Sequence, residues 1–132
     1  MFKPLQYDSG RTKELAVKDG ETISKGDALQ FDSGKVKRAA SGTHNVRFVA
    51  LEGVTEASDA KILAVQTHGV EFEADCTNTT NIDQVGVSNA LTDHEYVNNT
   101  NTETGNAFVV TEIVGAAADK KVRGYFLDRV NV

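Results

Sequence analysis

The chain has 132 residues, the usual size of a single domain, and this length suffices for one hydrophobic core. Its formal net charge is −5, and an acidic chain repels phosphates, so we expect no nucleic-acid partner. The one cysteine, Cys76, excludes an intramolecular disulfide and a CxxC metal knuckle.

The first twelve residues precede the predicted strands and contain Phe2, Pro4, Leu5 and Tyr7. They lack the apolar region of a signal peptide, and no later run approaches the roughly 18 apolar residues of a membrane helix. We therefore expect neither a signal peptide nor a membrane partner. Pro4 favours an extended backbone, and the apolar side chains around it are typical of anchors for a partner. We predict that residues 1–12 form an extended arm outside the core; a frayed terminus is the alternative.

The stretch VKDGETISKGDAL, residues 17–29, places two glycines before a short predicted strand. It resembles the hammerhead corner of biotinyl- and lipoyl-carrier domains, which attach their cofactor to a lysine at a hairpin tip. A hairpin is indeed predicted next, because Asp32-Ser33-Gly34 separates two short strands. Lys35 is the nearest candidate for attachment, but it lacks the Met or Ala flanks of the carriers. We therefore expect no bound cofactor.

The clearest signal is an internal repeat: FVALEGVTEASDAKI at 48–62 returns as FVVTEIVGAAADKKV at 108–122. Seven of the fifteen positions are identical without a gap, where average composition predicts about one. Val, Ile, Thr and Phe are frequent in both copies, which favours strands. We predict an all-β chain with one domain over residues 1–132, in which two related units, 17–67 and 70–128, close one barrel or sandwich.

Two strands of the second unit show different alternation. Residues 70–75, VEFEAD, alternate apolar and acidic side chains, which predicts a half-exposed antiparallel strand with an acidic outer face. Residues 121–127, KVRGYFL, carry apolar side chains on both faces. We expect this second strand to be buried on both sides or to lie at an interface.

No motif in the sequence requires catalysis. A zinc site could be assembled from His68, Cys76 and His94, but their spacing matches no standard ligand pattern. The GxSxG nucleophile turn and the phosphate-binding glycine loops are absent from the sequence. Glu71 and Glu73 form a carboxylate pair that also fits an ordinary acidic strand face. We expect no catalytic residue and no metal site, and hence no enzyme.

The order of these features resembles the capsid decoration, or cement, proteins of tailed phages. The resemblance runs from about Val17 onward through AVKDGETISKGDALQFDSGKVKRA, FVALEGVTEASDAKILAVQTHGVEF, VGVSNALTDHEYV and AFVVTEIVGAAADKKVRGYFL. It implies a β-tulip-like closed barrel that assembles as a homotrimer on the outer capsid surface of the virion, after synthesis in the host cytoplasm. The partner would be the major capsid protein, whose subunit contacts the trimer would stabilise.

The same resemblance assigns capsid binding to the N-terminal arm, and so to Phe2, Pro4, Leu5 and Tyr7. Two alternatives stay open from the sequence. The chain could be another virion β-protein, such as a tail-tube or head-fibre subunit. It could also be a carrier or binding domain built on the hammerhead corner.

Overall fold

The structure, a computed structural model, describes residues 1–43, 45–100 and 106–127. Over these residues the chain is all β, with eleven strands in two sheets and three short 3-10 helices. No helix among the described residues is long and apolar enough to cross a membrane. Residues 101–105 and 128 of the predicted second unit lie outside the described part of the chain.

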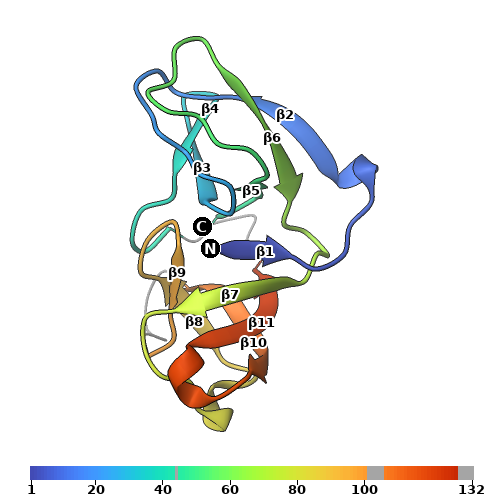
Figure 1. Cartoon of the computed structure of the whole chain (residues 1–132), viewed down its shortest axis with the longest axis vertical. Helices are drawn as coiled ribbons and strands as arrows, with labels where there is room; N and C mark the ends of the chain where they lie inside the picture. Colours follow the sequence, from blue (N-terminus) through green and yellow to red (C-terminus); the bar gives the residue numbers. More distant parts are fainter. Residues whose placement is uncertain (44, 101–105, 128–132) are drawn as a thin grey trace.

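Apart from β1, each half of the chain builds one sheet, and the two sheets lie one above the other in Figure 1. The first sheet has the order β2-β6-β5-β3-β4, and the second has the order β1-β7-β11-β10-β8-β9. The strands of the first sheet are β2 (Thr12–Ala16), β3 (Ala28–Asp32), β4 (Lys35–Arg38), β5 (Phe48–Ala50) and β6 (Lys61–Gln66). Those of the second are β1 (Phe2–Pro4), β7 (Phe72–Cys76), β8 (Ser88–Leu91), β9 (Tyr96–Asn98), β10 (Asn106–Val114) and β11 (Lys121–Phe126). The 3-10 helices are η1 (Ser9–Arg11), η2 (Ile82–Gln84) and η3 (Ala117–Asp119).

The two sheets repeat one pairing scheme, with β1 as an addition to the second. Strands β2 to β6 pair in the same order as strands β7 to β11. The register also repeats at the offset of the sequence repeat: Phe48 pairs with Gln66 in the first sheet, and Phe108 pairs with Phe126 in the second. The similarity between residues 48–62 and 108–122 therefore coincides with equivalent positions in two β-units.

In each unit, one parallel contact also joins the last strand of the pairing order to the first strand or to the residue directly after it. In the first unit Val17, just after β2, pairs with Val36 of β4. In the second unit Cys76 of β7 pairs with Val97 of β9. As a result β7 has β11 on one edge and both β1 and β9 on the other. These contacts protect strand edges that would otherwise expose unpaired backbone groups.

A glycine marks the same corner in both units. Gly26 and Gly86 precede β3 and β8 and have φ angles of 90° and 85°, a region that favours glycine over residues with a Cβ. The Gly26 amide donates to the Ala50 carbonyl at 2.8 Å, and the Gly86 amide donates to the Val110 carbonyl at 2.7 Å. The carrier-like corner of the sequence is therefore a turn that both halves share.

The main hydrophobic core joins the two sheets. Four phenylalanine rings form its centre: Phe126 lies 5.0 Å from Phe2 and 5.2 Å from both Phe72 and Phe108, measured between ring centroids. Buried side chains of the first sheet belong to the same cluster, among them Val49 and Val65. A second, smaller cluster lies within the first unit and contains Leu15, Val17, Ile23, Leu29, Val36, Ala50, Ala57, Ile62 and Ala64.

The N-terminal segment corrects a prediction. Residues 1–12 were expected to form an arm outside the core, but β1 pairs antiparallel with β7 and Phe2 is fully buried. The physical reason is twofold: the ring fills the aromatic cluster, and the strand covers an edge of β7. Pro4 fits at this position because β1 is the edge strand of its sheet, where a missing N–H is tolerated.

The other strand predictions meet different outcomes. The hairpin is confirmed, with Asp32 paired with Lys35 across its turn. The acidic strand is confirmed as well, since Phe72 and Ala74 are buried. For residues 121–127, burial on both sides is wrong because Tyr125 is 38% exposed, and a place at an interface stays a prediction.

Replacing Phe2 by alanine tests the corrected role of the N-terminus. We expect Phe2→Ala to lower the free energy of unfolding by about 3–5 kcal/mol, because it removes a buried ring from the aromatic cluster. Leu5→Ala, at a position 38% exposed, serves as the control and should cost less than about 1 kcal/mol. Urea denaturation measures both, and equal losses for the two variants would contradict this assignment.

Comparison of the two units predicts a stabilising substitution. Leu29 and Asn89 occupy equivalent positions, paired with Phe48 and Phe108, and both are buried. The Asn89 side-chain oxygen has no hydrogen-bond partner among the described residues. Removing such a buried oxygen should raise the free energy of unfolding, by about 1 kcal/mol for Asn89→Val. The reciprocal Leu29→Asn should lower it by about 3 kcal/mol. A loss of stability in Asn89→Val, measured by urea denaturation, would refute the comparison.

Candidate interaction surface

The predicted partner-binding residues divide between the core and the surface. Phe2 belongs to the core, and Pro4 is half-buried in β1. Leu5 and Tyr7 follow β1 and are 38% and 41% exposed. The segment that carries them lies at the junction of the two sheets, next to the N-terminus in Figure 1. The structure thus separates one buried anchor from two exposed apolar side chains.

Hydrogen bonds hold this segment against the second unit and the connection that leads to it. The Leu5 amide donates to the Glu71 carbonyl at 2.9 Å, which extends the pairing of β1 beyond Pro4. The Arg11 guanidinium donates from Nη1 to the His68 carbonyl at 2.5 Å. The Met1 ammonium donates to Asp75 Oδ2 at 3.1 Å and to the Glu95 carbonyl at 2.7 Å. The backbone is therefore fixed at Leu5, and Tyr7 lies between Leu5 and Arg11, which are both held by hydrogen bonds.

Tyr7 borders two hollows on this side of the molecule. One has a volume of about 320 Å³ and is lined by Gln6, Tyr7, Asp8, Arg11, Gly69 and Val70. The other has a volume of about 150 Å³ and is lined by Met1, Phe2, Lys3, Pro4, Tyr7, Lys25, Gly26, Ala50 and Leu51. We call the exposed side chains of Met1, Leu5 and Tyr7, together with these hollows, the N-terminal surface.

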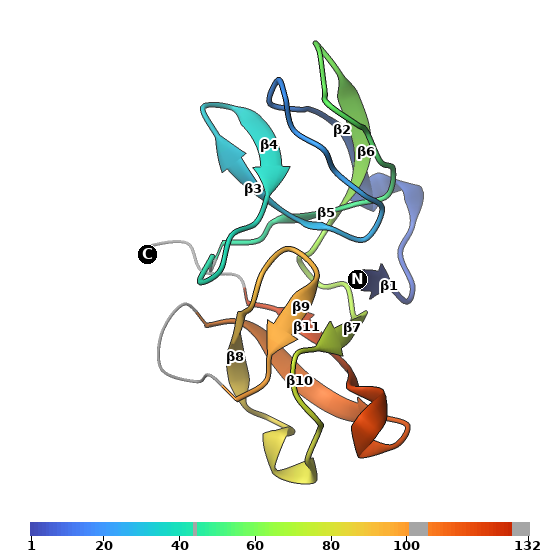
Figure 2. The same cartoon turned by 60° about the vertical axis from the view of Figure 1, so that its left-hand side comes forward.

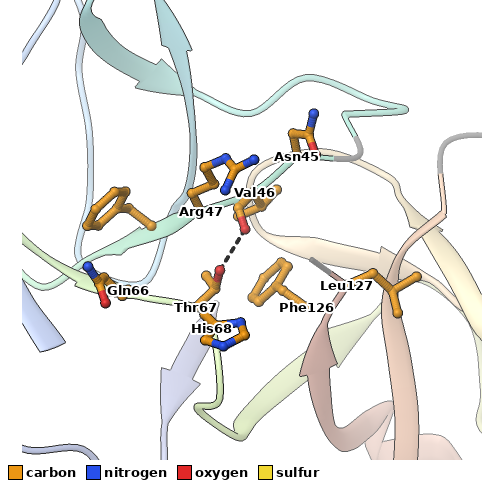
Figure 3. A pocket seen from close by; sticks show the side chains of 9 residues that line it. Asn45, Val46, Arg47, Gln66, Thr67, His68, Phe126 and Leu127 are labelled. Atoms are coloured by element: carbon orange, nitrogen blue, oxygen red, sulfur yellow. Dashed lines mark hydrogen bonds between the residues drawn. The ribbon is translucent and has the colours of Figure 1, made fainter. Parts of the chain in front are cut away.

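A separate pocket of about 300 Å³ opens where the ends of β6 and β11 meet the start of β5 (Figure 3). Its lining mixes polar and apolar side chains from both halves: Asn45, Val46, Arg47, Phe48, Gln66, Thr67, His68, Phe126 and Leu127. The Thr67 hydroxyl donates to the Val46 carbonyl at 2.7 Å, the bond drawn in Figure 3. The connection between the two units is thus fixed at the wall of this pocket.

Sequence reasoning missed an exposed aromatic beside this pocket. Phe31 is 47% exposed and lies edge-on to Phe48, with 5.9 Å between ring centroids. It lines a neighbouring hollow that shares Asn45 and Arg47 with the pocket of Figure 3. In the sequence, the sign of this exposure is that Phe31 stands directly before the turn at Asp32, because the end of a strand projects beyond the core.

An ion-pair cluster ties the N-terminus to the second sheet. Asp75 accepts a hydrogen bond from Lys121 Nζ at 2.8 Å as well as from the Met1 ammonium. Burial raises the pKa of Asp75, but the bonds from Lys121 and the ammonium outweigh burial and hold this pKa below its ordinary value. The same contact raises the pKa of Lys121. At the neighbouring Cys76, burial raises the thiol pKa to about 12, so the thiol stays protonated at neutral pH.

The structure does not assemble the sites that the sequence left as candidates. Among the described residues, one group of histidine, cysteine and carboxylate donors lies mutually within 4.8 Å, and it consists of Asp27, His94 and Glu95. His68 and Cys76 are not part of it. The pair at 71 and 73 is engaged on the strand face: Glu71 accepts from the Thr111 hydroxyl, and Glu73 lies 3.9 Å from Arg123.

Lys35, the carrier candidate, is exposed at the tip of the β3–β4 hairpin. Carrier domains attach their cofactor to a lysine at such a tip. The residues beside Lys35 are not the Met or Ala of those carriers, and they are ordinary turn residues. Asp32, on the other side of the turn, forms ion pairs with Lys18 and Lys37, and these hold its pKa below the ordinary value, the hydrogen bond from Lys18 contributing most.

Comparison of the chain with family models, with curated proteins and with solved structures finds no match. Function is therefore inferred from the residues and surfaces described above.

The ion pairs of Asp75 predict a pH dependence. A carboxylate with a lowered pKa in the folded state adds stability above its unfolded pKa of about 4 and loses it as the pH falls through the folded value. Asp75→Asn should therefore lower the unfolding free energy at pH 7 by about 0.5–1 kcal/mol, with a smaller difference from wild type below pH 4. Urea denaturation at a series of pH values measures this, with the exposed Glu14→Gln as the control. A difference that is constant from pH 7 to pH 3 would contradict it.

Proposed function

We propose that this chain is a non-enzymatic structural protein of a phage virion, a decoration protein that binds the outer surface of the assembled capsid. It is made in the host cytoplasm, and its partner is the major capsid protein, whose subunit contacts it stabilises. The observation that carries the proposal is the N-terminal surface, where a firmly anchored backbone presents Leu5 and Tyr7 to solvent.

Anchoring supports a binding role because it reduces the entropy lost on association. An unpaired tail would have to be ordered when it docks, at a cost of about 1–2 kcal/mol for each backbone residue. Here Phe2 is already buried and Leu5 already hydrogen-bonded, so that cost falls on folding and not on docking. In this proposal Pro4, Leu5 and Tyr7 face the capsid, and Phe2 supports them from inside the core.

We further propose that the two related units form a small closed β-barrel of the β-tulip type within a single domain. Within each unit, one parallel contact joins the first strand, or the residue directly after it, to the last strand in the pairing order: Val17–Val36 in the first unit and Cys76–Val97 in the second. A core with residues from both sheets packs the two units together and supports a single closed body. A decoration protein is present in many copies at a small distance from one another. Copies at such short distances must not aggregate. Protected strand edges and a net charge of −5 both oppose aggregation.

A shell-binding experiment tests the proposal. We expect Leu5→Ser combined with Tyr7→Ser to weaken co-sedimentation with empty shells of the cognate phage at least tenfold, because the apolar contact area is lost. Ile82→Ser is the matched control: Ile82 is 74% exposed on η2, at the end of the second sheet remote from the first (Figures 1 and 2). Unchanged binding by the double variant, or an equal loss in the control, would refute the assigned surface.

We propose further that the protein is a homotrimer, and light scattering of the purified protein measures its mass. A free protein with the mass of one chain would contradict the trimer. Failure of the wild-type protein to bind shells would refute the decoration function as a whole. Rings or fibres formed by the purified protein without shells would instead favour a tail-tube or head-fibre subunit.

A further inference from the structure

We propose that Asp27, His94 and Glu95 form a binding site for a divalent transition-metal cation of the zinc class. One donor atom from each side chain lies within 4.8 Å of the others, and His94 Nε2 is 3.4 Å from Glu95 Oε1. Donors bound to one ion at about 2.0–2.2 Å are separated by at most twice that length, so small side-chain rotations bring all three into range. This site goes beyond the proposed capsid function and does not rest on it.

The site lies between the two units and takes ligands from both. Asp27 ends the corner before β3, and His94 and Glu95 lie in the turn between β8 and β9. This turn points toward the first sheet in both Figure 1 and Figure 2. The Ala28 amide donates to the His94 carbonyl at 2.9 Å, which fixes the corner and the turn against each other. Asp93 Oδ1 accepts from the Glu95 amide at 2.7 Å and so shapes the turn itself.

The Asp27 carboxylate is the observation that points to a ligand. Its side chain is only 3% exposed, and both of its hydrogen bonds fall on Oδ2, from the Ser24 amide at 2.8 Å and from Arg38 Nε at 3.0 Å. Among the described residues, no hydrogen bond reaches Oδ1. Oδ1 is not one of the fully buried atoms without a partner, so it keeps contact with solvent and is free to accept a cation. The bonds on Oδ2 correspond to the outer hydrogen bonds that usually orient a metal-ligating carboxylate.

The donor set selects the class of cation. One imidazole and two carboxylates suit Zn²⁺ and its neighbours, whereas Mg²⁺ and Ca²⁺ prefer oxygen ligands alone. Three protein ligands leave the fourth position of a tetrahedral ion to water. Arg38 compensates one of the two carboxylate charges, so the site keeps one net negative charge toward the cation. The Met1 ammonium is directed to the Glu95 carbonyl and to Asp75, and leaves the Glu95 carboxylate available.

The test uses the full, untagged chain, because an affinity tag of histidines would itself bind the metal. We expect calorimetry with Zn²⁺ to show one site per chain. At a tenfold excess of Zn²⁺ over its Kd, the thermal midpoint should rise by about 5 °C, because the ion joins residues of both units in the folded state. Mg²⁺ at the same concentration should leave the midpoint unchanged.

Two variants and one matched control decide the assignment. His94→Gln should abolish the zinc-induced shift, and Glu95→Gln should weaken zinc binding at least tenfold. His68→Gln, which removes a histidine that lies outside the cluster, should retain the full shift. Asp27 is left intact, because its removal would also strand Arg38 and confuse a folding defect with lost binding. The proposal is overturned if wild type shows no zinc binding, if Mg²⁺ acts equally, or if His94→Gln retains the shift.

Discussion

The packing of two β-sheets on one aromatic cluster is the interaction on which the remaining structure depends. Phe72, Phe108 and Phe126 come from the second sheet, and Val49 and Val65 reach the same cluster from the first. The fourth ring, Phe2, comes from the opposite end of the chain. Without this ring the cluster would contain a cavity of aromatic size. Without β1, this edge of β7 would keep only its short pairing with β9. The position of the N-terminal segment, and with it the N-terminal surface, follows from this packing.

The internal repeat was readable because it is local and gapless. Residues 48–62 and 108–122 match at a constant offset, and the strands that they form keep that offset in their register. The hairpin at Asp32 and the acidic strand at 70–75 were readable for the same reason: turn residues and alternation are short-range signals. The all-β class therefore followed from the sequence.

The role of Phe2 was not readable, because its strand partner Ala74 and its ring partners Phe108 and Phe126 lie far along the chain. A short apolar stretch before the first strand looks the same whether it docks on its own sheet or on a neighbour. The same limit applies to Asp27 and His94, which meet only because the two sheets pack. Phe31 was overlooked for a different reason: its strand alternates normally, and exposure arises from its place at a strand end.

The two units share a scheme but have diverged in their contents. The buried position of Leu29 in the first unit is taken by Asn89 in the second. The corner of the first unit folds Ile23 into the core, whereas the corresponding connection of the second unit forms η2 and exposes Ile82. The units thus differ at one buried position, Leu29 against Asn89, and in one connection, which is exposed at Ile82 in the second unit. Such divergence is expected where two copies of a unit are no longer required to make identical contacts.

Cys76, buried at the end of β7 and protonated at neutral pH, has a practical consequence for experiments on this protein. Maleimide and iodoacetamide reagents need an accessible thiolate, and the native chain offers them none. A cysteine introduced at an outward position, such as Ile82, would accordingly take up a fluorophore or spin label alone. A label at that position could then be followed without first removing the natural thiol.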